Sequence, residues 1–472
     1  MRHSTVPLFD AGEVIDRPAR EAAAVKVSQS DDLVTGIAGA ALWGPLLDRL
    51  GLVDEADRRL LRPIGPGGYS GGECYRAVVE VILAGGDVVS DRSLLGGTAN
   101  ERLRGGHVLP SQWTLWRFGA GADLGRAMRA AAVNRAMLAR AWAMGGGPEP
   151  GLVTIDPDAT DVATYGLGKE GSTFCYKGQT GLSPMVGVCG ETGDVLGVRA
   201  RAGNAYPGRA IASFIRECHG AIPAPVRDES NIWVRVDSAG YQLEVIDICT
   251  ELGTAFTITA PAKKNVAAAI HALATDPGTV WSPALGTEGK RGSEVAETTL
   301  TIGASRNHAE AVRHVRLIVR RQRTRDGDQL SFDDLDGWRF HAIITNLPPL
   351  FAPAPQVEYH HRRRGGIPED AIRQLKEDFA FGHAPFSNFF GNWLWWHACA
   401  LAHNTCRWIR VLALPDEFHR CRGKRWRLAF FNLAARVVNH AGATRLRLAG
   451  NYTQAGAFIE ALTRIRRLPA YA

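Results

Sequence analysis

Long apolar runs are missing from this chain of 472 residues. No run reaches the roughly 18 residues that a membrane-spanning helix needs, and residues 1–30 lack the apolar stretch of a secretory signal peptide. Closely spaced cysteines are missing too: none of the eight forms a CxxC pair, which argues against a zinc ribbon and against a disulfide framework. The sequence therefore predicts a cytoplasmic protein that does not enter a membrane.

Positive charge is concentrated toward the C-terminus. The whole chain carries a net charge of +7, whereas residues 358–472 hold 18 Arg and Lys against 8 Asp and Glu, a balance of +10. Arginine predominates over lysine, and its planar guanidinium can grip a phosphate at two points. A polyanion such as nucleic acid is one interpretation. The other is the arginine-rich composition that a GC-rich genome produces.

The spacing of apolar residues divides the chain into parts with different expected secondary structure. Residues 1–30 are expected to be loosely ordered. Apolar residues at helical spacing predict a helical domain over residues 31–144, of a kind that often binds DNA, in which Ser111 is a plausible N-cap. The glycine- and proline-rich stretch 145–150 marks a boundary. The succession of strands and helices over residues 151–412 then predicts an α/β domain, interrupted at about 263–335 by a β-rich insertion. A basic helical region over 413–472 completes the prediction.

Within the α/β part, short apolar runs predict strands, and longer periodic segments predict helices. Leu152–Ile155 and Ile232–Val236 are expected to be buried strands. Pro368–Phe379 is expected to be a helix with proline in its first turn, and Asn388–Val411 a long buried helix. Cys399 and its neighbours on that helix are better explained as a buried face than as metal ligands, because a fourth ligand is not evident.

Three acidic residues are placed where chemistry could occur. Asp158 follows the first strand, Asp237 ends the strand Ile232–Val236, and Glu369 opens a helix after the insertion. Carboxylates at strand ends can converge at one edge of an α/β sheet. Oxygen ligands without His or Cys favour hard cations such as Mg²⁺. Each acid taken alone has a simpler explanation, because Asp after a strand is a common turn residue or N-cap.

Several stretches, in order, resemble one family. They are Pro110–Phe118, Asp156-Pro157-Asp158-Ala159-Thr160 (D-x-D-x-T), Gly203-Asn204, Arg235-Val236-Asp237-Ser238-Ala239-Gly240-Tyr241 (R-x-D-S-x-x-aromatic), Thr345-Asn346 and Tyr359–Lys376 (Tyr…Arg…Glu…Lys). Over about residues 35–470 the chain resembles bacterial insertion-sequence transposases of the DDE class, in the branch called transposase DDE domain group 1. The family's arginine stands four residues before the glutamate, where this chain has Gly365, so the resemblance does not say which neighbouring arginine takes that role.

The resemblance implies an RNase H-like fold in which Asp158, Asp237 and Glu369 are catalytic and bind two Mg²⁺ ions, with Mn²⁺ as a possible substitute. It leaves Asp156 as the alternative first ligand. The side chains that it suggests contact DNA are Tyr359, Arg362, Arg363, Arg364 and Lys376. It also implies double-stranded DNA with terminal inverted repeats and a target DNA as substrates, a homodimer that pairs two DNA ends, and action at the bacterial nucleoid.

Two further groups of residues are candidates for DNA contact. Trp281 lies in the insertion, where related transposases stack an aromatic ring on a flipped base; a core or surface tryptophan is the simpler interpretation. Arg422, Lys424 and Arg425 form a dense basic cluster that could contact phosphate or could be a solvated face. Two other functions stay open: an inactive or regulatory DNA-binding derivative, and a nuclease of the same fold that does not join strands.

Overall fold

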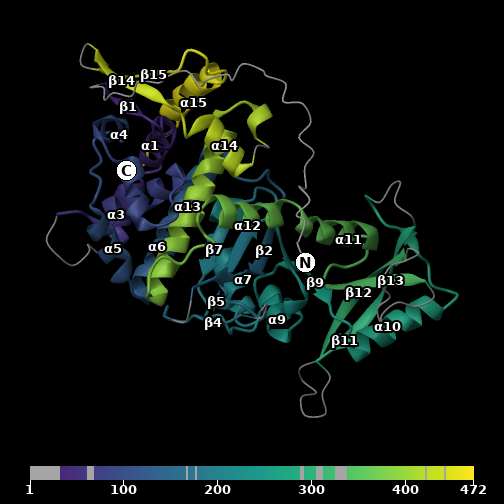
Figure 1. Ribbon diagram of the computed structural model, residues 1–472. Helices are drawn as coiled ribbons and strands as arrows, with labels where there is room; N and C mark the ends of the chain where they lie inside the picture. Colours follow the sequence, from purple (N-terminus) through teal and green to yellow (C-terminus); the bar gives the residue numbers. More distant parts are fainter. Residues whose placement is uncertain are drawn as a thin grey trace, which may run out of the picture.

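A mixed sheet of nine strands runs through the centre of the protein in this computed structural model (Figure 1). The structure describes residues 32–60, 68–165, 168–175, 178–286, 292–303, 312–324, 337–419, 422–440 and 443–471. Residues 1–30, predicted to be loosely ordered, lie outside these ranges. The sheet order is β10-β11-β12-β13-β9-β8-β2-β6-β7.

The nine strands of this sheet all lie between Leu152 and Thr345. They are β2 (Leu152–Ala159), β6 (Met185–Cys189), β7 (Val195–Arg199), β8 (Asn231–Val236), β9 (Ala255–Ala260), β10 (Ser282–Pro283), β11 (Ser293–Ile302), β12 (Arg313–Arg323) and β13 (Trp338–Thr345). Strands β2, β8 and β9 are parallel neighbours, and all the other pairings are antiparallel. The helices between them are α7 (Ile211–Ala221), α8 (Ala224–Asp228), η3 (Ser238–Gly240), α9 (Leu243–Glu251) and α10 (Lys264–Thr275).

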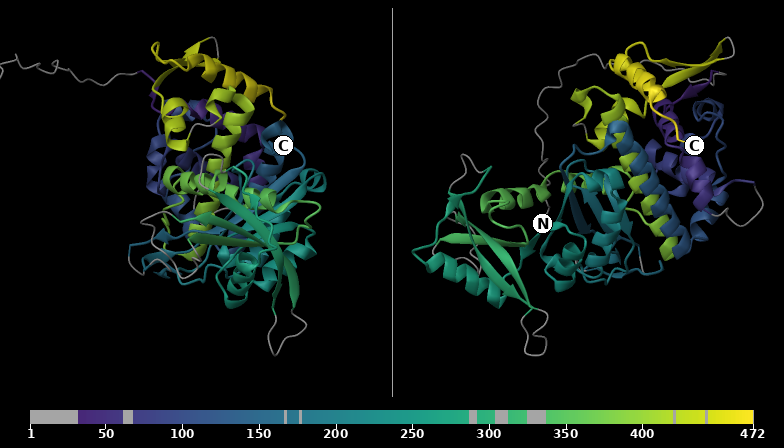
Figure 2. Two further views of the ribbon diagram at one scale, coloured as in Figure 1. Left: turned by 90° about the vertical axis from the view of Figure 1, so that its right-hand side faces the viewer. Right: turned by 180° about the vertical axis from the view of Figure 1, so that it is seen from behind.

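The strands of the predicted insertion extend this same sheet, because β12 pairs with β13, which pairs with β9 through Ala342 and Ala260. The insertion's strands β11 and β12 and its helix α10 project to one side, together with β13 and α11 (Ala354–Arg362), which follow the insertion (Figures 1 and 2). β11 and β12 lie within the stretch that was predicted to be a β-rich insertion. The region also contains the helix α10, whose buried Val266 and Leu273 supply an apolar face. A short three-stranded sheet, β3 (Val162–Ala163), β5 (Thr180–Leu182) and β4 (Thr173–Phe174), lies apart.

The N-terminal part is helical, as predicted. Its elements are α1 (Ala40–Arg49), α2 (Leu52–Arg59), α3 (Gly71–Ala84), η1 (Val89–Leu95), α4 (Thr98–Leu103), α5 (Gln112–Ala120), α6 (Leu124–Ala141) and η2 (Trp142–Gly146). Ser111 caps α5, because its hydroxyl accepts a hydrogen bond from the Thr114 amide at 3.2 Å. The predicted N-cap is therefore confirmed.

The long helix α13 (Phe389–Ala413) lies at the centre of these helices and contacts α1, α3, α5 and α6. One continuous hydrophobic core joins the helical part to the sheet. Cys399, His403 and Cys406 are buried on α13, as a packed helix face requires. No helix within the described ranges has the length and apolar character needed to cross a membrane.

The C-terminal region differs from the helical prediction. It contains η6 (Asp416–Phe418), α14 (Gly423–Phe430) and α15 (Ala455–Arg467), but also the strands β14 (Ala435–His440) and β15 (Ala443–Leu448). β14 pairs with β15 and also with β1 (Val34–Thr35) from the other end of the chain. A pairing partner about 400 residues away cannot be read from local periodicity, so helix was the wrong prediction for these strands.

Candidate active site

Asp158 and Asp237 lie side by side at the ends of neighbouring strands. β2 and β8 are parallel and in register, with Ile155 opposite Val234, so three residues farther on Asp158 is level with Asp237. Asp158 was predicted to follow its strand, but β2 continues to Ala159 because β6 pairs with it that far. Both acids are partly exposed and line one cavity of about 160 Å³. The fold thus brings these two carboxyl groups together.

The electrostatics around Asp158 set it apart from a surface carboxylate. Burial raises the pKa of its carboxyl group above the ordinary value, and the nearby Asp237 carboxylate raises it further, while the Arg364 guanidinium opposes the rise. An Nη2 atom of Arg364 lies 3.3 Å from the Asp158 carboxylate. Two neighbouring carboxylates favour a positive charge close to them, and Arg364 supplies such a charge beside Asp158.

Glu369 lies outside this cavity, in the first turn of α12 (Ile367–Asp378). Its carboxylate Oε1 is 3.8 Å from the point where a Cβ on Gly365 would stand, so the side chain folds back over η5 (Arg363–Gly365). Among the residues that the structure describes, no group of three or more His, Cys, Asp and Glu side chains is arranged to hold a metal ion. Asp158 and Asp237 suit a hard divalent cation by their oxygen donors, and the ligand role of Glu369 stays a prediction.

Asp156, the alternative first ligand, is already engaged. Its side chain lies two residues before Asp158 on β2 and is 1% exposed. Both carboxylate oxygens accept hydrogen bonds from Arg235, at 2.8 Å from Nε and 2.6 Å from Nη2. With both oxygens bound to one guanidinium, Asp156 is less available to a metal than Asp158, whose carboxylate faces the cavity.

The side chains predicted to contact DNA have different surroundings. Tyr359 is 39% exposed, and the Arg362 guanidinium lies 5.6 Å from the centre of its ring. Nε of Arg362 also donates to Glu358 at 2.9 Å. Lys376 donates from Nζ to the Asp161 carbonyl at 2.9 Å, next to the first acidic motif. Arg363 is exposed.

Trp281 and the basic cluster do not line the cavity of Asp158 and Asp237. The Arg321 guanidinium stacks on the Trp281 ring at 4.0 Å and on the Trp338 ring at 4.4 Å. Trp281 is therefore part of a cation–π stack on the insertion. The basic residues at and just before α14 that were predicted to contact DNA are all exposed: Arg422, Lys424 and Arg425.

Arg235 is the residue at this site to which the sequence analysis gave no role. Asp156 and Arg235 each stand two residues before an acid that was singled out, on two strands that run parallel. That equal spacing was visible in the sequence and could have predicted the pair, since residues two apart on a strand share a face.

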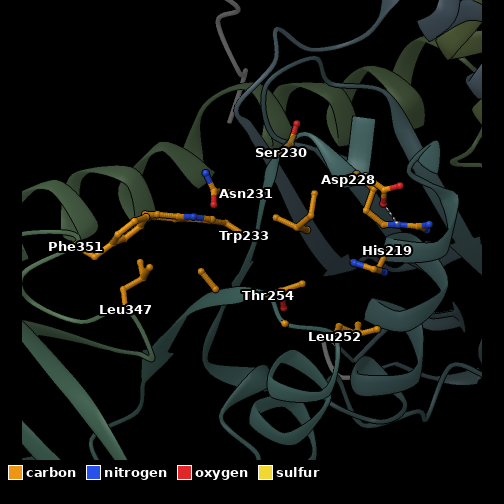
Figure 3. A pocket seen from close by; sticks show the side chains of 13 residues that line it. His219, Asp228, Ser230, Asn231, Trp233, Leu252, Thr254, Leu347 and Phe351 are labelled. Atoms are coloured by element: carbon orange, nitrogen blue, oxygen red, sulfur yellow. Dashed lines mark ion pairs between the residues drawn. The ribbon is translucent and has the colours of Figure 1, made fainter. Parts of the chain in front are cut away.

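A larger cavity of about 390 Å³ lies at the opposite end of β8, where Asn231 begins the strand (Figure 3). Trp233, Leu347 and Phe351 line one side of it, and His219 lies on the other. None of the predicted site residues, all of which lie within the described ranges, lines this cavity. The acids and this cavity are therefore separate features of the sheet.

Comparison with known proteins identifies the family of this chain. The chain resembles a piggyBac transposase in a synaptic complex with hairpin DNA, solved by cryo-electron microscopy, with a TM-score of 0.36, 10% identity, and coverage of 78% of this chain and 73% of that chain. No curated protein matches the chain. Residues 75–470 match the family described as Transposase DDE domain group 1. The match spans most of the sequence, so the chain belongs to the transposase DDE domain group 1 family.

Proposed function

We propose that this protein is a DNA transposase that cleaves at the ends of an insertion sequence and joins the freed strand to target DNA, with Asp158, Asp237 and Glu369 as its catalytic residues. The observation that carries the proposal is the shared cavity of Asp158 and Asp237 at the ends of two parallel strands. Family membership supplies the class of reaction. The site of action is the nucleoid in a bacterial cytoplasm.

The order of the central strands supports an RNase H-like core. β2, β6 and β7 form an antiparallel meander, and β8 and β9 then add in parallel on the other side of β2. Under this proposal residues 151–412 form the catalytic domain, with the insertion between β9 and β13. Residues 31–144 bind the DNA end and residues 413–472 add a basic surface.

The proposed cofactor is a pair of Mg²⁺ ions held by the three acids, with Mn²⁺ as a substitute. Bound there, the ions would activate a water or a 3′-hydroxyl and stabilise the leaving oxygen. Asp158 and Asp237 present hard oxygen donors on one cavity. Glu369 has to turn from η5 toward that cavity for the set to be complete.

The protein's own cations are suited to hold the DNA backbone. Among the three neighbouring arginines, Arg364 fits the family's role best, because its guanidinium lies beside Asp158 while Arg362 is held by Glu358. Lys376 and Tyr359 would contact phosphates near the scissile bond. The exposed cations of α14 would lie along the same DNA end. An unstacked base would stack on the Trp281 ring, in the position that the Arg321 guanidinium occupies here.

The test uses purified full-length protein, DNA carrying the inverted repeats that flank its gene, a target plasmid, and Mg²⁺ or Mn²⁺. We expect nicking at the ends and strand-transfer products with wild type. Asp158→Asn, Asp237→Asn and Glu369→Gln should abolish both while leaving end binding intact. Asp416→Asn, a change at a fully exposed acid, is the matched control and should leave cleavage unchanged.

Each alternative gives a different result in the same assay. End binding without nicking by wild type would identify an inactive derivative. Nicking without strand transfer would identify a nuclease that does not join strands. Continued cleavage by Glu369→Gln would exclude this residue as the third ligand while leaving the two aspartates in place. Size-exclusion chromatography with light scattering on end DNA would test the proposed homodimer.

A further inference from the structure

A buried ion pair lies next to the two acids, on the same two strands. Asp156 on β2 and Arg235 on β8 are joined by two hydrogen bonds, of 2.8 and 2.6 Å. Each is two residues before an acid of the cavity, Asp158 or Asp237, and therefore projects from the same face of the sheet as that acid. The ion pair and the two acids thus form consecutive cross-strand pairs.

The pair is enclosed on every side that the structure describes. Asp156 is 1% exposed and Arg235 is 2% exposed. Gly190 covers it: a Cβ at this glycine would stand 2.6 Å from Nη2 of Arg235 and 2.7 Å from Oδ2 of Asp156. A site closed in this way has no room for DNA or for a second cation, so the pair acts on the cavity through its neighbours.

Arg235 also reaches the element that carries the third motif. Its Nη1 donates to the His360 carbonyl at 2.7 Å, in the last turn of α11. The hydroxyl of Thr154, on the same face of β2, forms a hydrogen bond of 3.2 Å with Nε2 of His360. From His360 the chain continues directly through η5, which holds Arg364, into α12, which holds Glu369. The Arg235 guanidinium on β8 therefore contacts both β2 and α11, so that it links the three segments that contain the acidic motifs.

We propose that Asp156 and Arg235 are positioning residues: they fix the strands of Asp158 and Asp237 in register and anchor the end of α11, and with it the start of the segment that holds Arg364 and Glu369. This inference rests on the proposed function. It assigns to Asp156 the role of holding Arg235, and takes it out of the set of metal ligands. Buried ion pairs contribute little net stability but can specify one arrangement of the groups around them.

The test compares Asp156→Asn and Arg235→Lys with Asp194→Asn in the full chain. Asp194 is the matched control, because it is fully buried, pairs with Arg407 at 2.9 Å, and lies outside the cavity of the acids. Arg235→Lys keeps the positive charge but loses the planar fork that reaches Asp156 and His360 together. Melting temperatures of all variants are recorded, so that a general loss of stability can be compared with the control.

Two readouts address the positioning role. Without metal, hydrogen exchange of the backbone amides in residues 358–366 should be faster in Asp156→Asn and Arg235→Lys than in Asp194→Asn. The second readout is Mn²⁺ affinity, measured by electron paramagnetic resonance. It should fall about tenfold or more in both variants, because loss of a contact that supports a metal ligand commonly has an effect of this size. Exchange and affinity equal to those of Asp194→Asn would overturn the inference.

Two further variants separate the possible failures. Asp158→Ala should lose Mn²⁺ binding but keep slow exchange over residues 358–366. Asp156→Cys should not acquire tight Cd²⁺ binding; if it does, Asp156 is a ligand and the positioning role is wrong. Absence of Mn²⁺ binding by wild type would count against the proposed function alone, because the exchange measurement needs no metal.

Discussion

The Arg364 guanidinium lies 3.3 Å from the carboxylate of Asp158, which lines a cavity together with Asp237. The arginine reaches this point from η5, between the helix α11 and the helix α12 that carries Glu369. A cation supplied by the third motif therefore neutralises an acid of the first motif. We propose that the same guanidinium binds a DNA phosphate beside Asp158.

Replacement of Arg364 by alanine should reduce end cleavage about 100-fold, the usual cost of removing one fixed charge or donor from a reacting centre. The Asp158 carboxyl would lose the charge that opposes its raised pKa, and the phosphate would lose a contact. Single-turnover cleavage of labelled end DNA measures the loss. Arg216→Ala, at an exposed surface pair with Glu251, is the control. Equal rates for the two variants would show that Arg364 has no part in the reaction.

Gly190→Ala should destabilise the fold, because the added methyl group would collide with the Asp156–Arg235 pair. The expected cost is about 1–3 kcal/mol of unfolding free energy, typical of overpacking in a close-packed interior. Denaturant unfolding followed by tryptophan fluorescence measures it. Gly220→Ala provides the comparison, since the space around that glycine is open and alanine favours its helix. A Gly190→Ala protein as stable as Gly220→Ala would mean that the pair can move aside.

Local sequence pattern predicted the elements that carry the acids. The strand predicted at Ile232–Val236 is β8 (Asn231–Val236), and the helix predicted at Pro368–Phe379 is α12 (Ile367–Asp378). Continuous apolar runs and a proline in the first turn are signals that neighbouring residues supply on their own. The position of Asp237 at a strand end followed from the same signal.

Relationships between distant segments were beyond the same reasoning. The continuation of β2 to Ala159 depends on its pairing with Met185, and β14 depends on β15 and on the N-terminal Val34. Strand pairing is decided by partners across the sheet more than by intrinsic preference. The engagement of Asp156 likewise depends on an arginine 79 residues away, which only the parallel register brings into contact.

Acidification should destabilise the protein between pH 6.5 and about pH 4, because two histidines of α13 are buried in neutral form. Burial lowers the pKa of His397 to about 3 and that of His403 to about 4. The unfolded chain, with a histidine pKa near 6.5, binds protons in this range that the folded chain does not. Stability is therefore fully present above pH 6.5 and falls as the pH drops, by about 1.4 kcal/mol per pH unit for each histidine.

Urea unfolding at intervals between pH 7 and pH 5 measures this dependence. His403→Gln should reduce the slope of unfolding free energy against pH by the contribution of one histidine, whatever its effect on stability at pH 7. A slope identical to that of wild type would show that His403 does not bind an extra proton on unfolding.

The exposed cations of α14 give a prediction for DNA affinity. Trp426 and Phe430 anchor this helix in the core, while Lys424 and Arg425 point outward. Lys424→Glu and Arg425→Glu should each weaken binding to end DNA without lowering the melting temperature, because neither side chain is packed. If each contacts one phosphate, the slope of log affinity against log salt concentration should decrease in magnitude by about 1 per variant. The charge-conserving Lys424→Arg should retain both affinity and slope; salt slopes that are the same for wild type and both charge reversals would place DNA away from α14.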